Sequence, residues 1–439
     1  MLGVGLVACT TYRPLPLDGE AVLENPAPAA VVQQAGALRH ALIRPVVLDF
    51  SAPLSLDAIS VMAVVANPDL TALRLQQQVA TAQLFASGLF PDPQVSVGID
   101  RVLAPAEAGL VTGVAGGLSL DVLGTLFTRS VDRDVARRAS GQLRLDLAWA
   151  EWNTAGNARL LASRLPYLQQ VDTLSQQVSA TATQLLAQVQ EAAARGDLKA
   201  DDLQAQRAAG LDATLRATAA RKELLATRLA LNRVLGLRPD TTLALAEPES
   251  RPLPARPAMA ELFTAARRQR LDLQALSEGY AGQEAGLKRA VLGQYPRVGL
   301  TLNRNRDTSA VHSWGPAVNL DLPLWNRNRG EIAQAAAGRD LLRAEFAARL
   351  HQTRADIVAL ASALDEDEQA LVPARAEAAA LGSLAAAYSA AAVRGDLGRS
   401  VVEAARLAAI DKQITVLGLE QSCTEQRIAL ALLTGDPFP

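Results

Sequence analysis

Two stretches of the chain alternate between apolar and polar residues. In the first, Val95 and Val97 alternate with Ser96, and the alternation resumes over residues 118–122 after a loop that contains Gly and Pro. A period of two places successive side chains on opposite faces of a β-strand. The pattern therefore predicts a β-hairpin over residues 94–123 with one apolar and one polar face.

The same alternation returns in the second half of the chain and predicts a second hairpin over residues 297–323. We expect the apolar face of the two hairpins to carry Val95, Val97, Val298, Leu300, Leu320 and Leu322, and the polar face to carry Ser96, Thr301, Asn319 and Asp321.

Helical patterns rich in Ala and Leu flank both hairpins. Asn67-Pro68-Asp69 is expected to kink or cap the first helix, and Pro166 and Pro373 are expected to break the two long helices. A helix of about 65 residues is on the order of 100 Å long. The fold class is thus mainly α with a small β part. The predicted helices span residues 56–90, 128–195, 198–235, 259–292, 330–394 and 397–433.

The two halves of the chain show the same predicted order of helices and hairpin. Arg195-Gly196-Asp197-Leu198 recurs 199 residues further on as Arg394-Gly395-Asp396-Leu397, and Gly236 recurs at the same distance as Gly435. Such recurrence indicates an internal duplication. We divide the chain into a leader (1–9), an extended N-terminal arm (10–54), a first repeat (55–237), a Pro-rich linker (238–257) and a second repeat (258–436).

Composition and charge narrow the class of protein. Of the 439 residues, 49% are hydrophobic but only 4% are aromatic, which favours long packed helices over a compact α/β core. The net charge of −2 argues against a nucleic-acid binder and against a polybasic membrane patch.

The strand count and the placement of the aromatic residues suggest a membrane barrel. Two hairpins supply four strands, too few to close a barrel, whereas three chains supply twelve. Trp314 would lie at one bilayer interface. At the other interface we expect four rings from the ends of the two hairpins, namely Phe90, Phe127, Tyr295 and Trp325.

The N-terminus carries a candidate lipidation site. The apolar run that ends in Leu6-Val7-Ala8-Cys9 resembles a bacterial lipobox, in which the Cys thiol takes a diacylglycerol and becomes the new N-terminus. No Lys or Arg precedes the run, so we expect the true translation start to lie upstream. Thr10 follows the Cys, which by this resemblance implies sorting to the outer membrane. Cys423, within a helical pattern, is expected to be a core residue.

Three segments together resemble the TolC-like outer-membrane efflux protein family. They are Asn67-Pro-Asp-Leu, Gly88-Leu-Phe-Pro-Asp-Pro-Gln-Val and Leu322-Pro-Leu-Trp-Asn-Arg-Asn-Arg-Gly-Glu-Ile332, and the resemblance covers residues 55–436. It implies a homotrimer with a twelve-stranded barrel in the outer membrane and a long antiparallel α-helical barrel in the periplasm. Docking to a periplasmic adaptor and an inner-membrane pump is also implied. Cys9 fits the lipoprotein branch, which serves resistance-nodulation-division pumps for drugs, toxic small molecules or metal ions.

The resemblance also implies roles for residues at the helix turns. The turns at the periplasmic tip would form the closed end and the adaptor contact, and Glu403 and Asp202 are the candidate acids of a pore constriction. The tip residues implied by this match are Arg195, Gly196, Asp197, Arg394, Gly395 and Asp396.

Enzymatic chemistry is not expected. His40, His312 and His351 are far apart in the sequence, no ligand spacing typical of a metal site occurs, and no nucleophile is paired with a base. We therefore expect no cofactor and no metal. Two alternatives to the efflux duct stay open: an outer-membrane duct for type I protein secretion, and a soluble periplasmic coiled-coil scaffold.

Overall fold

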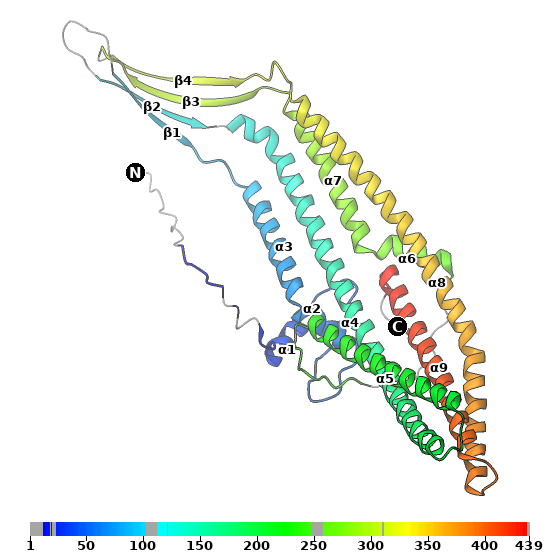
Figure 1. Ribbon diagram of the computed structural model, residues 1–439. Coiled ribbons are helices and arrows are strands. Elements are labelled where there is room, and N and C mark those ends of the chain that lie inside the picture. The colour runs from blue at the N-terminus through cyan, green and yellow to red at the C-terminus, as the bar shows by residue number, and fades with distance from the viewer. Residues whose placement is uncertain are drawn as a thin grey trace.

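The computed structural model describes residues 12–17, 19, 23–101, 112–120, 122–246, 258–309 and 311–436, with the side chains of 120 and 122–127 excepted. The lipobox at Cys9 and most of the linker 238–257 therefore lie outside the described residues. Within the described part the molecule is mainly helical, with a small sheet at one end of an elongated wall of helices (Figure 1).

The helices and strands alternate along the chain in the predicted order. The strands are β1 (Gln94–Asp100), β2 (Gly113–Leu120), β3 (Arg297–Arg306) and β4 (His312–Asp321). The helices are α1 (Pro28–Ala37), α2 (Leu56–Ala66), α3 (Pro68–Ser87), α4 (Val122–Ala194), α5 (Ala200–Val234), α6 (Met259–Gln269), α7 (Leu271–Leu292), α8 (Arg329–Val393) and α9 (Arg399–Thr434).

The four strands form one antiparallel sheet in the order β1-β2-β3-β4. The two predicted hairpins are therefore neighbours, joined through β2 and β3, where Val114–Leu120 pairs with Leu300–Arg306. Strands β1 and β4 are the outer strands of this sheet, and each has one side without a partner in the described chain.

The long helices α4 and α8 have 73 and 65 residues and are the central elements of the wall of helices (Figure 1). The predicted breaks at Pro166 and Pro373 are wrong, because both helices continue through their proline. A proline removes one helical hydrogen bond and crowds the preceding turn. Here α5 and α9 pack along the long helices, and this packing keeps the helical direction. Helix α4 also begins at Val122, earlier than predicted, directly after β2.

The shorter helices cover successive parts of the long ones. Helices α3 and α5 pack against α4, while α7 and α9 pack against both α4 and α8 (Figure 1). Small residues such as Ala155, Ala158 and Ala162 are buried along α4, which allows the helices to approach closely. Two short helices placed end to end thus match one long helix.

The segment predicted as one helix over 259–292 is two helices, α6 and α7, separated at Arg270, whose backbone is extended (φ −63°, ψ 115°). The equivalent break between α2 and α3 falls at Asn67, also extended (φ −66°, ψ 125°), and bends the chain by 52°. The break at Asn67 was visible in the sequence, because a proline follows Asn67. The break at Arg270 was not visible, because a leucine follows Arg270.

The arm predicted as extended over residues 10–54 contains a helix, α1, which begins at Pro28 in the first helical position. Its Val31 and Ala35 are buried. They belong to the largest hydrophobic core of the described residues, which joins the arm to α2, α4 and the end of α5. Turn-forming residues on both sides of this short helix hid its periodicity in the sequence.

Among the described residues, one helix is apolar enough by composition to cross a membrane. Helix α8 contains an 18-residue window with a mean hydropathy of 1.3, of which 6% is buried. The bent pair α2–α3 passes the same test only when taken together. At about 1.5 Å per residue, α8 is on the order of 100 Å long, about three times the hydrocarbon thickness of a bilayer.

Candidate functional site: an amphipathic sheet and two helical turns

One face of the sheet is apolar over most of its length. Residues paired across neighbouring strands point to the same face. Val95 pairs with Leu118, and Leu118 pairs with Leu302, so these three side chains form one row. Leu300 pairs with Val318 in the next row. These apolar side chains are exposed, with Val95 at 74%.

The register places the predicted apolar residues together. Val95, Val97, Val298, Leu300 and Leu320 lie on this face. Leu322 follows β4 by one residue and is 50% exposed.

The opposite face is polar. The Asn319 Nδ2 donates a hydrogen bond to the Thr301 Oγ1 at 2.8 Å, and Arg297 pairs with Asp321 in the ladder. The Ser96 hydroxyl donates to the carbonyl of Gly117 at 3.4 Å. All the polar residues predicted for this face share it, so the sheet has two faces of opposite character.

The aromatic side chains at the sheet are exposed. Phe90, Tyr295 and Trp325 lie where the sheet joins the helices, and Trp325 is 96% exposed. The guanidinium of Arg129 lies 3.9 Å from the centroid of the Phe90 ring. The side chain of Phe127 lies outside the described residues. Trp314 lies within β4 on the apolar face, farther from the helices.

The two turns at the far end of the helices have the same geometry. Gly196 (φ +82°) and Gly395 (φ +84°) adopt the left-handed conformation that glycine tolerates best. The Arg195 Nε lies 3.1 Å from the Asp197 Oδ2, and the matching Arg394–Asp396 distance is 3.0 Å. All four charged side chains are more than half exposed. Sequence recurrence and local geometry therefore agree at both turns.

The two candidate constriction acids differ in environment. Asp202 is exposed in the first turn of α5. The Glu403 side chain is only 14% exposed, and its carboxylate lies 3.4 Å from the Arg406 guanidinium. With the 199-residue spacing of the turns, the counterpart of Glu403 is Gln204 rather than Asp202.

A buried ionic joint, which sequence reasoning missed, lies at the break between α6 and α7. The Arg270 guanidinium binds both carboxylate oxygens of Asp272, at 3.0 and 2.7 Å. Both side chains are less than 10% exposed. The Arg349 Nη1 of α8 adds a contact of 3.2 Å to Asp272, and the Trp149 ring of α4 lies 4.8 Å from the guanidinium carbon of Arg270.

This joint also affects a neighbouring carboxyl group. Partial burial, together with the negative charge of Asp272, raises the pKa of Asp146 above its usual value, while a hydrogen bond from Gln142 opposes the shift. Arg270 further donates to the carbonyl of Leu433, at the end of α9. The joint thus connects α4, α7, α8 and α9.

The corresponding joint in the first half uses an uncharged side chain. The Asn67 Nδ2 donates to the carbonyl of Val234 at 2.9 Å, and its Oδ1 accepts from the amide of Leu70. Val234 precedes Leu433 by the same 199 residues that separate the two turns. Each break therefore contacts the equivalent end of the following short helix, once through an amide and once through a guanidinium.

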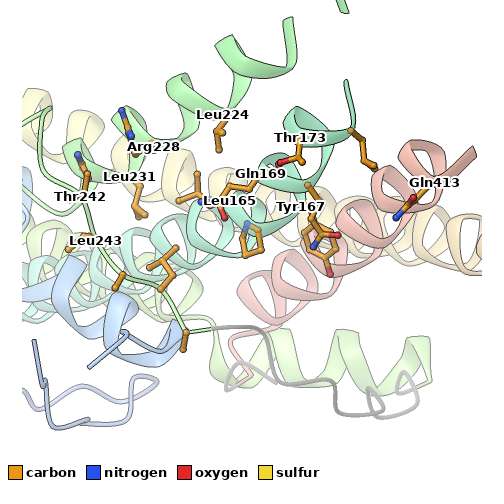
Figure 2. A pocket seen from close by; sticks show the side chains of 17 residues that line it. Leu165, Tyr167, Gln169, Thr173, Leu224, Arg228, Leu231, Thr242, Leu243 and Gln413 are labelled. Carbon is orange, nitrogen blue, oxygen red and sulfur yellow. The ribbon is translucent and has the colours of Figure 1, made fainter. Parts of the chain in front are cut away.

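The best-defined cavity, about 950 Å³, is open to solvent and lies between α4, α5, the segment 242–246 and Gln413 of α9 (Figure 2). Its lining includes Tyr167, Arg228 and several leucines but no His, Cys, Asp or Glu. It therefore offers no acid–base pair. In the part of the chain that the structure describes, no group of three or more metal-ligating side chains was found.

The described chain thus combines a sheet that has one exposed apolar face with a wall of long helices. No family model matches the chain, and no curated protein matches it significantly in sequence. A membrane protein from Pseudomonas aeruginosa is similar in structure, with a TM-score of 0.70, 18% identity, and coverage of 89% of this chain and 93% of that one.

Two outer-membrane channels are similar to the same degree. The Campylobacter jejuni CmeC channel gives a TM-score of 0.71 at 16% identity, over 87% of this chain and 86% of that one. The open state of the Neisseria gonorrhoeae MtrE channel gives 0.70 at 15% identity, over 87% and 89%. The chain therefore has the fold of the TolC-like outer-membrane efflux channels, which confirms at the level of fold the resemblance seen in its motifs.

Proposed function

We propose that three copies of this chain form an outer-membrane channel that serves as the exit duct of a tripartite efflux system. The observation that carries the proposal is the sheet, which exposes one apolar face and, among the described residues, leaves both outer strands without partners on one side. Open strand edges are not tolerated in lipid, because their amide and carbonyl groups would lack hydrogen bonds.

Three sheets joined edge to edge would give twelve strands and remove the open edges. Strands β3 and β4 have 10 residues each, the length that a tilted strand needs to cross a bilayer. The apolar face would meet lipid and the polar face would line a wet lumen. The exposed rings of Phe90, Tyr295 and Trp325 fit the inner bilayer interface, and Phe127 is proposed to join them.

The helices would extend into the periplasm as an α-helical barrel. Their exposed turns at Arg195–Asp197 and Arg394–Asp396 are the proposed contact with a periplasmic adaptor, which would connect the duct to an inner-membrane pump of the resistance-nodulation-division type. Asp202 and Glu403 are proposed to border the constriction. The two equivalent joints and turns support an internal duplication, with the domain boundaries given above.

The proposed cargo is a drug, a toxic small molecule or a metal ion, conducted passively without enzymatic chemistry or cofactor. Acylation of Cys9 would add a lipid anchor, which favours efflux over the alternative, a duct for type I protein secretion. The second alternative, a soluble periplasmic scaffold, does not account for an exposed apolar sheet face.

The facing of the strands provides the direct test. Val97→Asp or Leu320→Asp would place a carboxylate toward lipid and should abolish heat-resistant trimers in the outer membrane. The matched controls are Ser96→Asp and Thr301→Asp, at neighbouring positions on the polar face of the sheet. These variants should insert normally and conduct ions in planar bilayers. Equal loss of trimers in both sets of variants would refute the proposal that the chain forms a channel. A wild-type chain that stays monomeric and soluble without detergent would also refute it.

Cargo and anchor need separate measurements. Deletion of the gene, followed by screening of antibiotics, dyes, divalent metals and secreted proteins, distinguishes efflux from secretion. Cys9→Ser should abolish metabolic labelling with fatty acid, and labelling that persists would show that Cys9 is not the anchor.

A further inference from the structure

The apolar face of the sheet changes character at the end far from the helices. Arg304 pairs directly with Trp314, and Arg306 pairs with His312. On their other side these arginines pair with Gly116 and Val114 of β2. Both guanidinium groups therefore lie on the same face as Leu300 and Leu302, and both side chains are exposed.

In the part of the sheet that the structure describes, carboxylates do not neutralise these arginines. Asp100, at the end of β1, pairs with Gly113 and so lies on the polar face. Asp307 follows β3, and its Oδ1 accepts hydrogen bonds from the amides of Ser309 and Val311, each at 2.9 Å. Among the described residues no ion pair is formed by Arg304 or Arg306. The far end of the apolar face is thus a positively charged strip beside a tryptophan.

The length of the apolar face fixes the level of this strip. Trp314 lies within β4, and Leu322, one residue past the end of β4, follows it by eight residues. At about 3.4 Å per residue and a tilt of about 40°, they differ in height by about 21 Å, close to the apolar band of about 25 Å in outer-membrane barrels. When Leu322 lies at the inner boundary of the band, Trp314 and its partner Arg304 lie at the outer boundary. Arg306 lies one step further out, at the level of the headgroups.

We propose that Arg304 and Arg306, flanked by Trp314, bind the phosphate groups of the phosphorylated glycolipid, lipid A, that forms the outer leaflet around the channel. This inference rests on the proposed function, because it requires that the face meets lipid. A guanidinium binds phosphate through two parallel hydrogen bonds. The aliphatic part of the arginine side chain can remain in the apolar band while its charge reaches the headgroups. Trp314 suits the same boundary.

The lipid retained by the detergent-purified trimer tests the proposal. Native mass spectrometry after addition of bisphosphorylated lipid A, monophosphoryl lipid A or phosphatidylglycerol measures which lipid stays bound. The wild-type trimer should retain bisphosphorylated lipid A best. Arg304→Gln/Arg306→Gln should lower this retention by about tenfold or more, as expected for the loss of charge-assisted hydrogen bonds. Arg297→Gln, on β3 but on the polar face, is the matched control and should retain lipid A as the wild type does.

Four results would overturn the inference. Equal retention by the double variant and by Arg297→Gln would show that the strip does not bind the lipid. Retention of phosphatidylglycerol equal to that of lipid A, lost in the same variant, would assign the strip to anionic phospholipid instead. A wild-type trimer that conducts ions in bilayers but retains no lipid A would refute this inference alone. A chain that forms neither trimer nor channel would refute the proposed function, and this inference with it.

Discussion

Neutralising the buried carboxylate of Asp272 should destabilise the protein far more than the same change at the helical turn. Asp272→Asn preserves the side-chain shape but leaves the Arg270 guanidinium, only 6% exposed, without a counter-charge. Removing one partner of a buried ion pair costs about 3–5 kcal/mol. Unfolding entropy of about 2.1 cal/mol/K per residue corresponds to on the order of 1 kcal/mol/K for the 439 residues, so the unfolding midpoint should fall by about 3–5 °C.

The chain supplies a matched control for this experiment. Arg394 and Asp396 have the same two-residue spacing and a similar distance of 3.0 Å, but their side chains are 64% and 60% exposed. An exposed pair contributes about 0–1 kcal/mol, so Asp396→Asn should shift the midpoint by about 1 °C or less. Scanning fluorimetry of the purified trimer measures both variants, and Trp149 beside Arg270 reports on the joint itself. Equal shifts in the two variants would refute the argument that burial makes this pair important.

Two further predictions concern close packing. Gly156→Ala should lower the unfolding midpoint measurably, because a Cβ at Gly156 would lie 2.1 Å from the Leu432 Cδ2. The control is Gly210→Ala, whose Cβ would have an ordinary contact at 3.6 Å and which should be neutral or stabilising by up to about 1 kcal/mol. A Gly156→Ala variant as stable as the wild type would contradict the packing of α4 against the end of α9. Burial, reinforced by nearby carboxylates, raises the pKa of the Cys423 thiol. In a Cys9→Ser background, maleimide should therefore label Cys423 slowly at neutral pH until the chain is unfolded. Rapid labelling of Cys423 in the native trimer would contradict its burial.

Much of the sheet was predictable because its physical signal is local. Alternation along each strand predicted both hairpins and assigned residues such as Val97 and Thr301 to opposite faces. The joining of the hairpins through β2 and β3 was not predictable, because it depends on contacts between segments almost two hundred residues apart. Proline misled the prediction in the opposite sense, since α4 continues through Pro166 although a proline removes one helical hydrogen bond.

The charged residues show why part of the candidate site could not be predicted. Arg270 and Asp272 have the same spacing as Arg195 and Asp197; Gly196 marks the latter pair as a turn, but no residue marks the former pair as buried. The first pair is buried between helices and the second lies at an exposed turn, a difference created only by tertiary packing. Two Arg–Asp pairs with the same spacing therefore make different energetic contributions.

The two joints give the proposed assembly a lower symmetry than its shape suggests. Three chains with two similar halves would form a ring of six nearly equivalent units. Asn67 holds every second unit through a neutral amide, and Arg270 holds the units between them through a guanidinium already bound to Asp272. Stiff and compliant joints would then alternate around the ring. Any widening of the α-helical barrel would then have threefold rather than sixfold symmetry, because alternate helix pairs would move first.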